Sequence, residues 1–303
     1  MTAVRDADAV GVPIAEDARV AAGHRSPIRL ALRRFRRHRM ALVGSVVLLI
    51  VILAAVFAGP ISGHDPNAID LMSTRAAPSS QHWLGTDSTG RDVLSRLLYA
   101  GRVSLGVGLS AALLAVLAGT LLGSISGLAG GWLDGLIMRL ADVFMSFPSL
   151  VVMIVLAGII GPSVTTMVIA IGMFQWPTCA RLVRGVTLSL REQEYVHAAR
   201  IAGARPAWLM RKHIIPAALP PVTVVGTLAV AQGISLEATM SFLGLGVQPP
   251  AASWGNMLTE AQSLTVISSM PWLWVPPGVA VAITVLAVNF IGDGLRDAVD
   301  PRR

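Results

Sequence analysis

The sequence predicts an all-α polytopic membrane protein with six transmembrane helices, and three observations lead to this fold class. Of the 303 residues, 54% are hydrophobic and only 14% are charged, whereas soluble domains carry about 25% charged residues. The mean hydropathy is +0.67. Several long stretches contain no Asp, Glu, Lys or Arg. A soluble fold could not bury so much apolar surface. The composition therefore argues against two soluble domains, which the length alone would suggest.

The chain begins with a polar segment, residues 1–27, which we expect to be a disordered cytoplasmic tail because it cannot bury enough apolar surface to offset chain entropy. Residues 28–40 follow, with Ile28, Leu32 and Phe35 at helical spacing among arginines. This pattern predicts a basic amphipathic helix on the membrane surface. A solvated basic stretch that only fixes orientation is the alternative.

The remaining chain, residues 41–303, is expected to form one six-span domain. A spanning helix needs about 20 apolar residues. The uncharged stretch 143–180 is too long for one span and is broken by Gly161-Pro162-Ser163, so it predicts a helical hairpin. The expected spans are 41–58, 104–128, 143–160, 164–182, 217–240 and 273–291.

Basic residues predict the orientation of these spans. The segments 29–39 and 181–212 are rich in arginine, whereas 242–272 contains neither Lys nor Arg. The positive-inside rule therefore places the first two in the cytoplasm and the third outside. Both termini are then cytoplasmic, and the external loops are 59–102 and 242–272, although the first of these also carries arginines.

Several functional classes are excluded by residues that the sequence lacks. Lys212 is the only lysine, and no Gly-x-x-x-x-Gly-Lys-Ser/Thr loop is present, so any ATP-driven step must belong to another chain. Cys179 is the only cysteine, which rules out an intrachain disulfide and a cysteine metal site. Neither a His-Glu-x-x-His nor a Gly-x-Gly-Asp motif is present. We therefore expect a non-catalytic chain without its own cofactor or metal, and without a nucleic-acid partner because aromatic residues are scarce.

Between the fourth and fifth expected spans, residues 188–216 are too polar to cross a membrane but have helical patterning. Gly203 can end a helix with a positive φ and turn the chain. The small side chains of Ala198 and Ala199 leave a face on which another protein could dock closely. The segment predicts two short helices joined by a turn, with an ordinary connecting loop as the alternative.

The run EYVHAARIAGARPAWLMRKHIIP, residues 194–216, resembles the EAA loop of ABC importer membrane subunits. Its Ala-Ala-x-x-x-Gly part matches the motif, while His197 stands where the family has glutamate. The resemblance implies that this loop forms a coupling helix, which fits into a cleft on a separate ATPase subunit that binds ATP and Mg²⁺. The residues that we assign to ATPase coupling are Glu194, Tyr195, His197, Ala198, Ala199, Gly203, Ala204 and Pro216.

Three further blocks, residues 82–105, 237–258 and 289–302, are similar to segments of dipeptide/oligopeptide/nickel-type permeases. The chain most resembles the second of that family's two permease subunits. This resemblance implies the ABC type I importer permease fold in a bacterial cytoplasmic membrane. It also implies three kinds of partner, namely a second homologous permease subunit, ATPase subunits and an extracytoplasmic substrate-binding protein.

The substrate and one rival mechanism stay open at this point. The resemblance implies that small peptides are carried, with nickel or another small solute as an alternative. A self-sufficient secondary transporter or channel is the rival function. Such a transporter would not need a polar helical hairpin between spans, and it would more often carry charges at the membrane midplane.

The external loop 59–102 contains a turn-rich segment just before the second span. Its Asp and Thr side chains could cap the helix that carries Val93, Leu97 and Leu98, a helix that we expect to lie at the outer membrane surface. The alternative role is contact with an outer partner. The candidate residues are Gly85, Thr86, Asp87, Gly90, Arg91 and Asp92.

The fifth expected span contains three further candidate residues. Pro220 and Pro221 should kink or loosen the helix, which a gating element could use. Glu237 is expected near the outer interface, where an ionisable group is a functional candidate by default. A structural hydrogen bond or snorkelling to the interface is the alternative role for Glu237.

Overall fold

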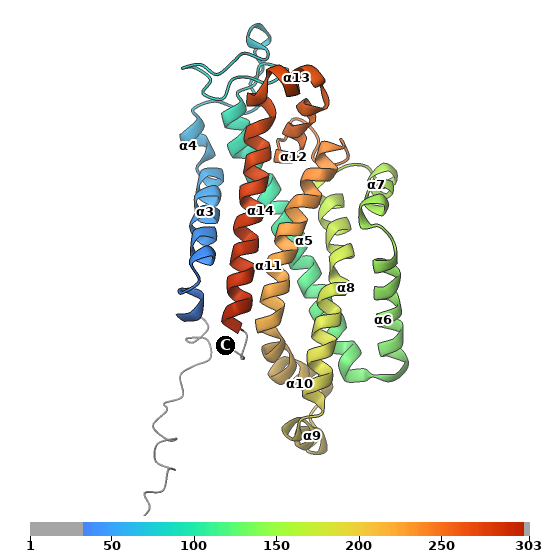
Figure 1. Cartoon of the computed structure of the whole chain (residues 1–303). Coiled ribbons are helices and arrows are strands. Elements are labelled where there is room, and N and C mark those ends of the chain that lie inside the picture. Colours follow the sequence, from blue (N-terminus) through green and yellow to red (C-terminus); the bar gives the residue numbers. More distant parts are fainter. Residues whose placement is uncertain (1–32, 300–303) are drawn as a thin grey trace, which may run out of the picture.

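The computed structural model describes residues 33–299, so the expected tail 1–27 and the first part of the expected basic helix 28–40 lie outside the described residues (Figure 1). In the part that is described the secondary structure is helical, apart from one isolated β-bridge between Thr86 and Asp92. The prediction of an all-α membrane protein is therefore confirmed.

Within residues 33–299, five helical segments are long and apolar enough to cross a membrane. They contain the helices α3 (Arg39–Val56), α5 (Val93–Ala129), α8 (Val164–Arg191), α11 (Ile215–Phe242) and α14 (Pro271–Val299). A sixth span exists only if α6 (Gly131–Ser146) and α7 (Ser149–Ile160), which are bent by 87° at their junction, are counted as one. The break falls at Phe147, which is extended because Pro148 follows it. The expected helical hairpin around residues 161–163 is present between α7 and α8.

Shorter helices connect and cap the spans. They are α4 (Ala58–Ser62), η1 (Leu71–Ser73), α9 (Glu194–Ile201), α10 (Pro206–Leu209), η2 (Met210–Ile214), α12 (Trp254–Met257), η3 (Leu258–Gln262) and α13 (Leu264–Ser269). Figure 1 shows α9 and α10 at one end of the bundle and α12 and α13 at the other. We call these the α9 end and the α13 end. The start of α3 and the end of α14 both lie at the α9 end.

The helix that contains the expected span 104–128 is much longer than predicted. Helix α5 runs for 37 residues from Val93, about 55 Å at 1.5 Å per residue, which exceeds the hydrocarbon thickness of about 30 Å. The segment with Leu97 and Leu98, expected to be a separate helix on the membrane surface, is the first part of α5. Arg96 is tolerated there because it is buried next to the carboxylate of Asp87, 3.4 Å away.

Helices α5 and α8 pack closely through small residues. Gly119, Gly123 and Gly127 lie four residues apart on one face of α5, and a Cβ atom at each would come within 2.6 Å of an atom of α8. Small residues at this spacing let two membrane helices approach backbone to backbone. Cys179 is buried in this contact, next to Gly119.

Candidate coupling site and the polar network at the opposite end

Helix α9 and the turn after it form the outermost part of the α9 end (Figure 1). Gly203 has a φ of +85°. Its N–H donates to the Arg200 carbonyl oxygen at 2.9 Å, and the Ala204 N–H donates to the Ala199 carbonyl oxygen at 3.0 Å. These two bonds define a Schellman motif, in which a left-handed residue satisfies the last carbonyls of a helix. The predicted pair of short helices joined at Gly203 is therefore present.

Several large apolar side chains are exposed on this turn, beside the exposed side chains of Arg200 and Arg205. Ile201 is 88% exposed, and Tyr195 and Trp208 are about half exposed. Among the other candidates Glu194, His197, Ala198 and Gly203 are exposed, and Ala199 and Ala204 are partly buried. Exposed apolar side chains grouped beside small residues are typical of a protein-binding surface.

The exposed face is held to the bundle by a few buried side chains. Val196 and Ile214 are fully buried, and Leu209 is nearly so. The imidazole ring of His213 lies between two aromatic rings, 5.5 Å from Tyr195 and 5.2 Å from Trp208, measured between ring centroids.

A π-helical turn, η2, joins α10 to α11 at the base of this site. The Ile215 N–H donates to the Met210 carbonyl oxygen, five residues back. Pro216 follows this turn as the second residue of α11, inside the continuous helical segment Pro206–Phe242. Helix α11 continues through Pro220 and Pro221. Single π-turns inside helices frequently occur at functional sites.

Arginines of α8 connect the candidate coupling site to the spans. Arg184 donates two hydrogen bonds to Asp134 of α6, at 2.6 and 2.7 Å, and Asp134 also accepts from Ser126 of α5. Arg191 donates to the Gly127 carbonyl oxygen of α5 at 3.3 Å. Because α9 starts three residues after α8 ends, a displacement of α9 would act directly on these three helices.

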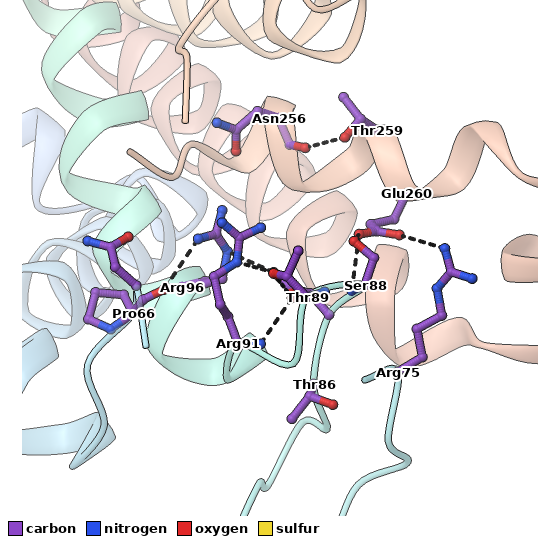
Figure 2. A network of polar contacts seen from close by, with 12 residues as sticks. Pro66, Arg75, Thr86, Ser88, Thr89, Arg91, Arg96, Asn256, Thr259 and Glu260 are labelled. Atoms are coloured by element: carbon purple, nitrogen blue, oxygen red, sulfur yellow. Dashed lines mark hydrogen bonds and ion pairs between the residues drawn. The ribbon is translucent and has the colours of Figure 1, made fainter. Parts of the chain in front are cut away.

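At the α13 end, the turn-rich segment is ordered by Asp87, whose partners Thr89 and Arg91 are labelled in Figure 2. Its carboxylate accepts from the N–H and hydroxyl of Thr89 at 2.8 Å and from the Arg91 side chain at 2.7 Å. Burial acts to raise the pKa of Asp87, but the hydrogen bonds from Thr89 and Arg91 outweigh burial and hold this pKa below the ordinary value of 3.8. The ionised form of Asp87 therefore stabilises the turn.

The other candidates in this segment also contribute to its order. Asp92 is the N-cap of α5 and accepts from the Ser95 N–H at 2.7 Å, which confirms the predicted capping role. Thr86 accepts from the Ala76 N–H at 2.9 Å and donates to the Ser73 carbonyl oxygen. Gly85 and Gly90 have φ values of +72° and +80°. Thr86, Asp87 and Asp92 are buried, so their side chains are engaged within the chain.

Glu260 of η3 joins the two loops at the α13 end. Figure 2 shows it between Ser88 and Arg75. Its carboxylate accepts from the Ser88 N–H at 3.3 Å and lies 3.9 Å from the Arg75 guanidinium group. A cavity of about 230 Å³ opens between the loops, with Arg91, Arg96 and Glu260 among its lining residues. Sequence reasoning missed this link because the two loops are far apart in the chain.

Glu237 lies close to the end of α11 that is at the α13 end, as expected, but inside the protein. Its side chain is fully buried and accepts hydrogen bonds of 2.7 Å from the Ser104 and Ser241 hydroxyl groups. Ser104 also accepts from the Trp254 N–H at 3.1 Å. The structural alternative for Glu237 is thus confirmed, and snorkelling is wrong because α5 and the 242–257 segment cover the carboxylate.

Two family comparisons match most of the chain. Residues 119–303 match the binding-protein-dependent transport system inner membrane component family. Residues 26–78 match the N-terminal transmembrane domain of oligopeptide transport permease C.

Individual relatives are similar over nearly their whole length. A candidate peptide permease protein of Brucella suis biovar 1 (strain 1330) is 47% identical over 277 residues, which cover 91% of each chain. The glutathione transport system permease protein GsiD of Shigella flexneri serotype 5b (strain 8401) is 42% identical over 279 residues, which cover 92% of this chain and 91% of that protein.

Proposed function

Because the chain belongs to the family of binding-protein-dependent transport system inner membrane components, we propose that it is the permease subunit that forms half of the translocation pathway of an ATP-driven ABC importer. The second half comes from a homologous permease subunit. Separate ATPase subunits supply the energy, and an extracytoplasmic binding protein delivers the substrate. This chain itself carries out no catalysis and binds no cofactor, since ATP and Mg²⁺ are held by the ATPases.

The observation that carries this proposal is the geometry of α9 and the turn at Gly203. Exposed apolar side chains lie on α9 and beside its Schellman turn, beyond the ends of the spans. The Arg184–Asp134 pair ties the preceding helix α8 to α6. A partner that pulls on α9 would therefore move the spans, which is the work expected of an ATPase-coupled helix.

The α9 end faces the cytoplasm in this proposal. The arginines of segments 29–39 and 181–212 support this orientation under the positive-inside rule. It follows that both termini are cytoplasmic and that the α13 end receives the binding protein. The ordered loops around Asp87 and Glu260 then form the receiving surface.

Small peptides are the proposed cargo. Support comes from relatives whose names specify peptides or glutathione, itself a small peptide. The selection among peptides is expected to lie mainly in the binding protein.

Co-purification tests this proposal. The full chain is expressed with its neighbouring genes and purified in mild detergent, and the recovered proteins are identified by mass spectrometry. Recovery of a second permease and of P-loop ATPases would support the proposal. Reconstitution of that complex should then give ATP-dependent uptake of tri-alanine. Recovery of this chain alone, still able to move solutes in vesicles, would instead indicate a self-sufficient transporter.

A further inference from the structure

A groove with a volume of about 460 Å³ lies along α11, between α8 and α14. Figure 1 shows α11 between these two helices, with α5 behind it. Half of the lining residues are polar, and none of the lining residues in the described part of the chain is charged. The polar lining residues are Gln175, Thr178, Gln232, Ser235 and Asn289.

The groove is on the side of α11 that faces away from α5. Gly233 and Ile234 of α11 contact Gly108 of α5. Gln232 and Ser235 flank these residues in sequence, but the helical turn of 100° per residue directs them to the other side. Gln175 and Gln232 lie near the middle of α8 and α11. The polar groups are thus at the depth of the hydrocarbon core of a membrane.

Gln175 is the most informative residue of the groove. Its side chain is only 9% exposed, and neither its amide oxygen nor its amide nitrogen has a hydrogen-bond partner within residues 33–299. A buried amide without partners is destabilising by about 1–3 kcal/mol. Both amide atoms are covered in this structure, so an occupant of the groove reaches them when the Gln175 side chain turns toward it.

We infer that this groove is a binding site for the backbone of a translocated peptide, an inference that rests on the proposed importer function. A primary amide offers both a donor and an acceptor, which complement the C=O and N–H groups of a peptide bond. Gln175 from α8, Gln232 from α11 and Asn289 from α14 supply three such amides. Because no charged residue in the described part of the chain lines the groove, it offers no ion pair to an acidic or basic side chain, and only the peptide backbone is recognised.

Two other occupants fit the groove less well. Lipid tails offer no hydrogen bonds, and polar groups facing them are costly. A tightly packed helix of the second permease would need small residues, as at the α5–α8 contact. The groove instead presents long Gln side chains around a space that is many times the roughly 30 Å³ share of one water molecule.

The first test uses thiol labelling of the complete importer in membrane vesicles. Cys179→Ala removes the native cysteine, and Gln232→Cys or Asn289→Cys then places a single thiol in the groove. A water-soluble methanethiosulfonate should label these thiols, and transport of tri-alanine should slow the labelling several-fold. Ile50→Cys on α3, a residue that is 59% exposed on the outside of the bundle, is the lipid-facing control and should react only with a lipid-soluble maleimide.

Three results would overturn the inference. Labelling that tri-alanine does not change would show a water-filled space that the peptide does not occupy. Reaction with the lipid-soluble maleimide alone would show that the groove faces lipid. Protection from both reagents, with a disulfide to a cysteine of the second permease, would show a subunit interface.

The second test asks whether Gln175 contacts the peptide backbone. Gln175→Leu should lower tri-alanine uptake about tenfold, the equivalent of one lost hydrogen bond of about 1.4 kcal/mol, with ATPase activity retained. Uptake of N-methylated tri-alanine, which lacks the donors, should change much less. Thr284→Val is the control, because the Thr284 hydroxyl is buried and bonds only within α14 in the described residues.

Equal losses for both peptides would show that Gln175 accepts no hydrogen bond from a peptide N–H, and an unchanged uptake of tri-alanine would exclude backbone recognition by Gln175 altogether. Failure of the wild-type chain to assemble with ATPases would instead contradict the proposed function. The two failures are therefore distinguishable.

Discussion

The Ser104 hydroxyl group donates a hydrogen bond of 2.7 Å to the buried carboxylate of Glu237, which connects α5 to α11 inside the protein. The same Ser104 oxygen accepts from the Trp254 N–H. Ser241 donates to the other carboxylate oxygen and accepts from the Val247 N–H at 3.2 Å. Glu237 is therefore the centre of a network that holds the 242–257 segment on the two helices.

Glu237→Ala should be strongly destabilising, because it leaves the Ser104 and Ser241 hydroxyl groups buried without their acceptor. We expect a loss of about 2–3 kcal/mol and a lower midpoint of thermal unfolding in detergent, followed by tryptophan fluorescence. Glu237→Gln keeps one acceptor oxygen and should lose less. Equal midpoints for Glu237→Ala and the wild type would show that the network does not stabilise the fold.

Gly90→Ala should disorder the 63–92 loop. A Cβ atom at Gly90 would lie 1.8 Å from the Asp70 carbonyl oxygen, and its φ of +80° is unfavourable for alanine. Gly63 has a similar φ of +68°, but no atom of the described residues lies within 4 Å of its Cβ position. Gly63→Ala is thus the matched control and should lose only about 1–2 kcal/mol.

Limited proteolysis of purified protein separates the two glycine variants. Gly90→Ala should be cut in the loop much faster than Gly63→Ala. Similar cleavage of the two would mean that backbone strain, and not the contact with Asp70, determines the order of this loop.

Acid should weaken the turn around Asp87 in a predictable direction. Its pKa in the folded protein lies below 3.8, so the ionised carboxylate stabilises the fold fully above that value, and the contribution is lost as the pH falls through the folded-state pKa. The difference in unfolding free energy between the wild type and Asp87→Asn should therefore be constant near neutral pH and shrink in acid. A difference that stays constant throughout the acid range would contradict this role.

Local features were predictable from the sequence, whereas contacts between distant residues were not. The Asp92 cap and the turn at Gly203 depend on residues within one helical turn. By contrast, we expected the third span to start at residue 143, just after the last charged residue of that region. In the structure, helix α6 already begins at Gly131. Its charges Asp134 and Asp142 are tolerated because Arg184 and Arg181 of α8 pair with them. Such pairing depends on tertiary structure, as does the burial of Glu237.

Gly203 is the residue at which the coupling proposal is most directly testable. Its positive φ closes α9 through the Schellman bonds to Ala199 and Arg200. A β-branched residue is poorly tolerated there, so Gly203→Val should change the angle between α9 and α10. No atom of residues 33–299 lies within 4 Å of its Cβ position, and the new side chain would instead occupy space needed by the ATPase. We expect Gly203→Val to retain ATP hydrolysis but lose most tri-alanine uptake in reconstituted vesicles.

Gly185→Ala is the matched control, because Gly185 lies inside α8, has no positive φ and also has free space around its Cβ position. Normal uptake by Gly203→Val would refute the docking role of this turn.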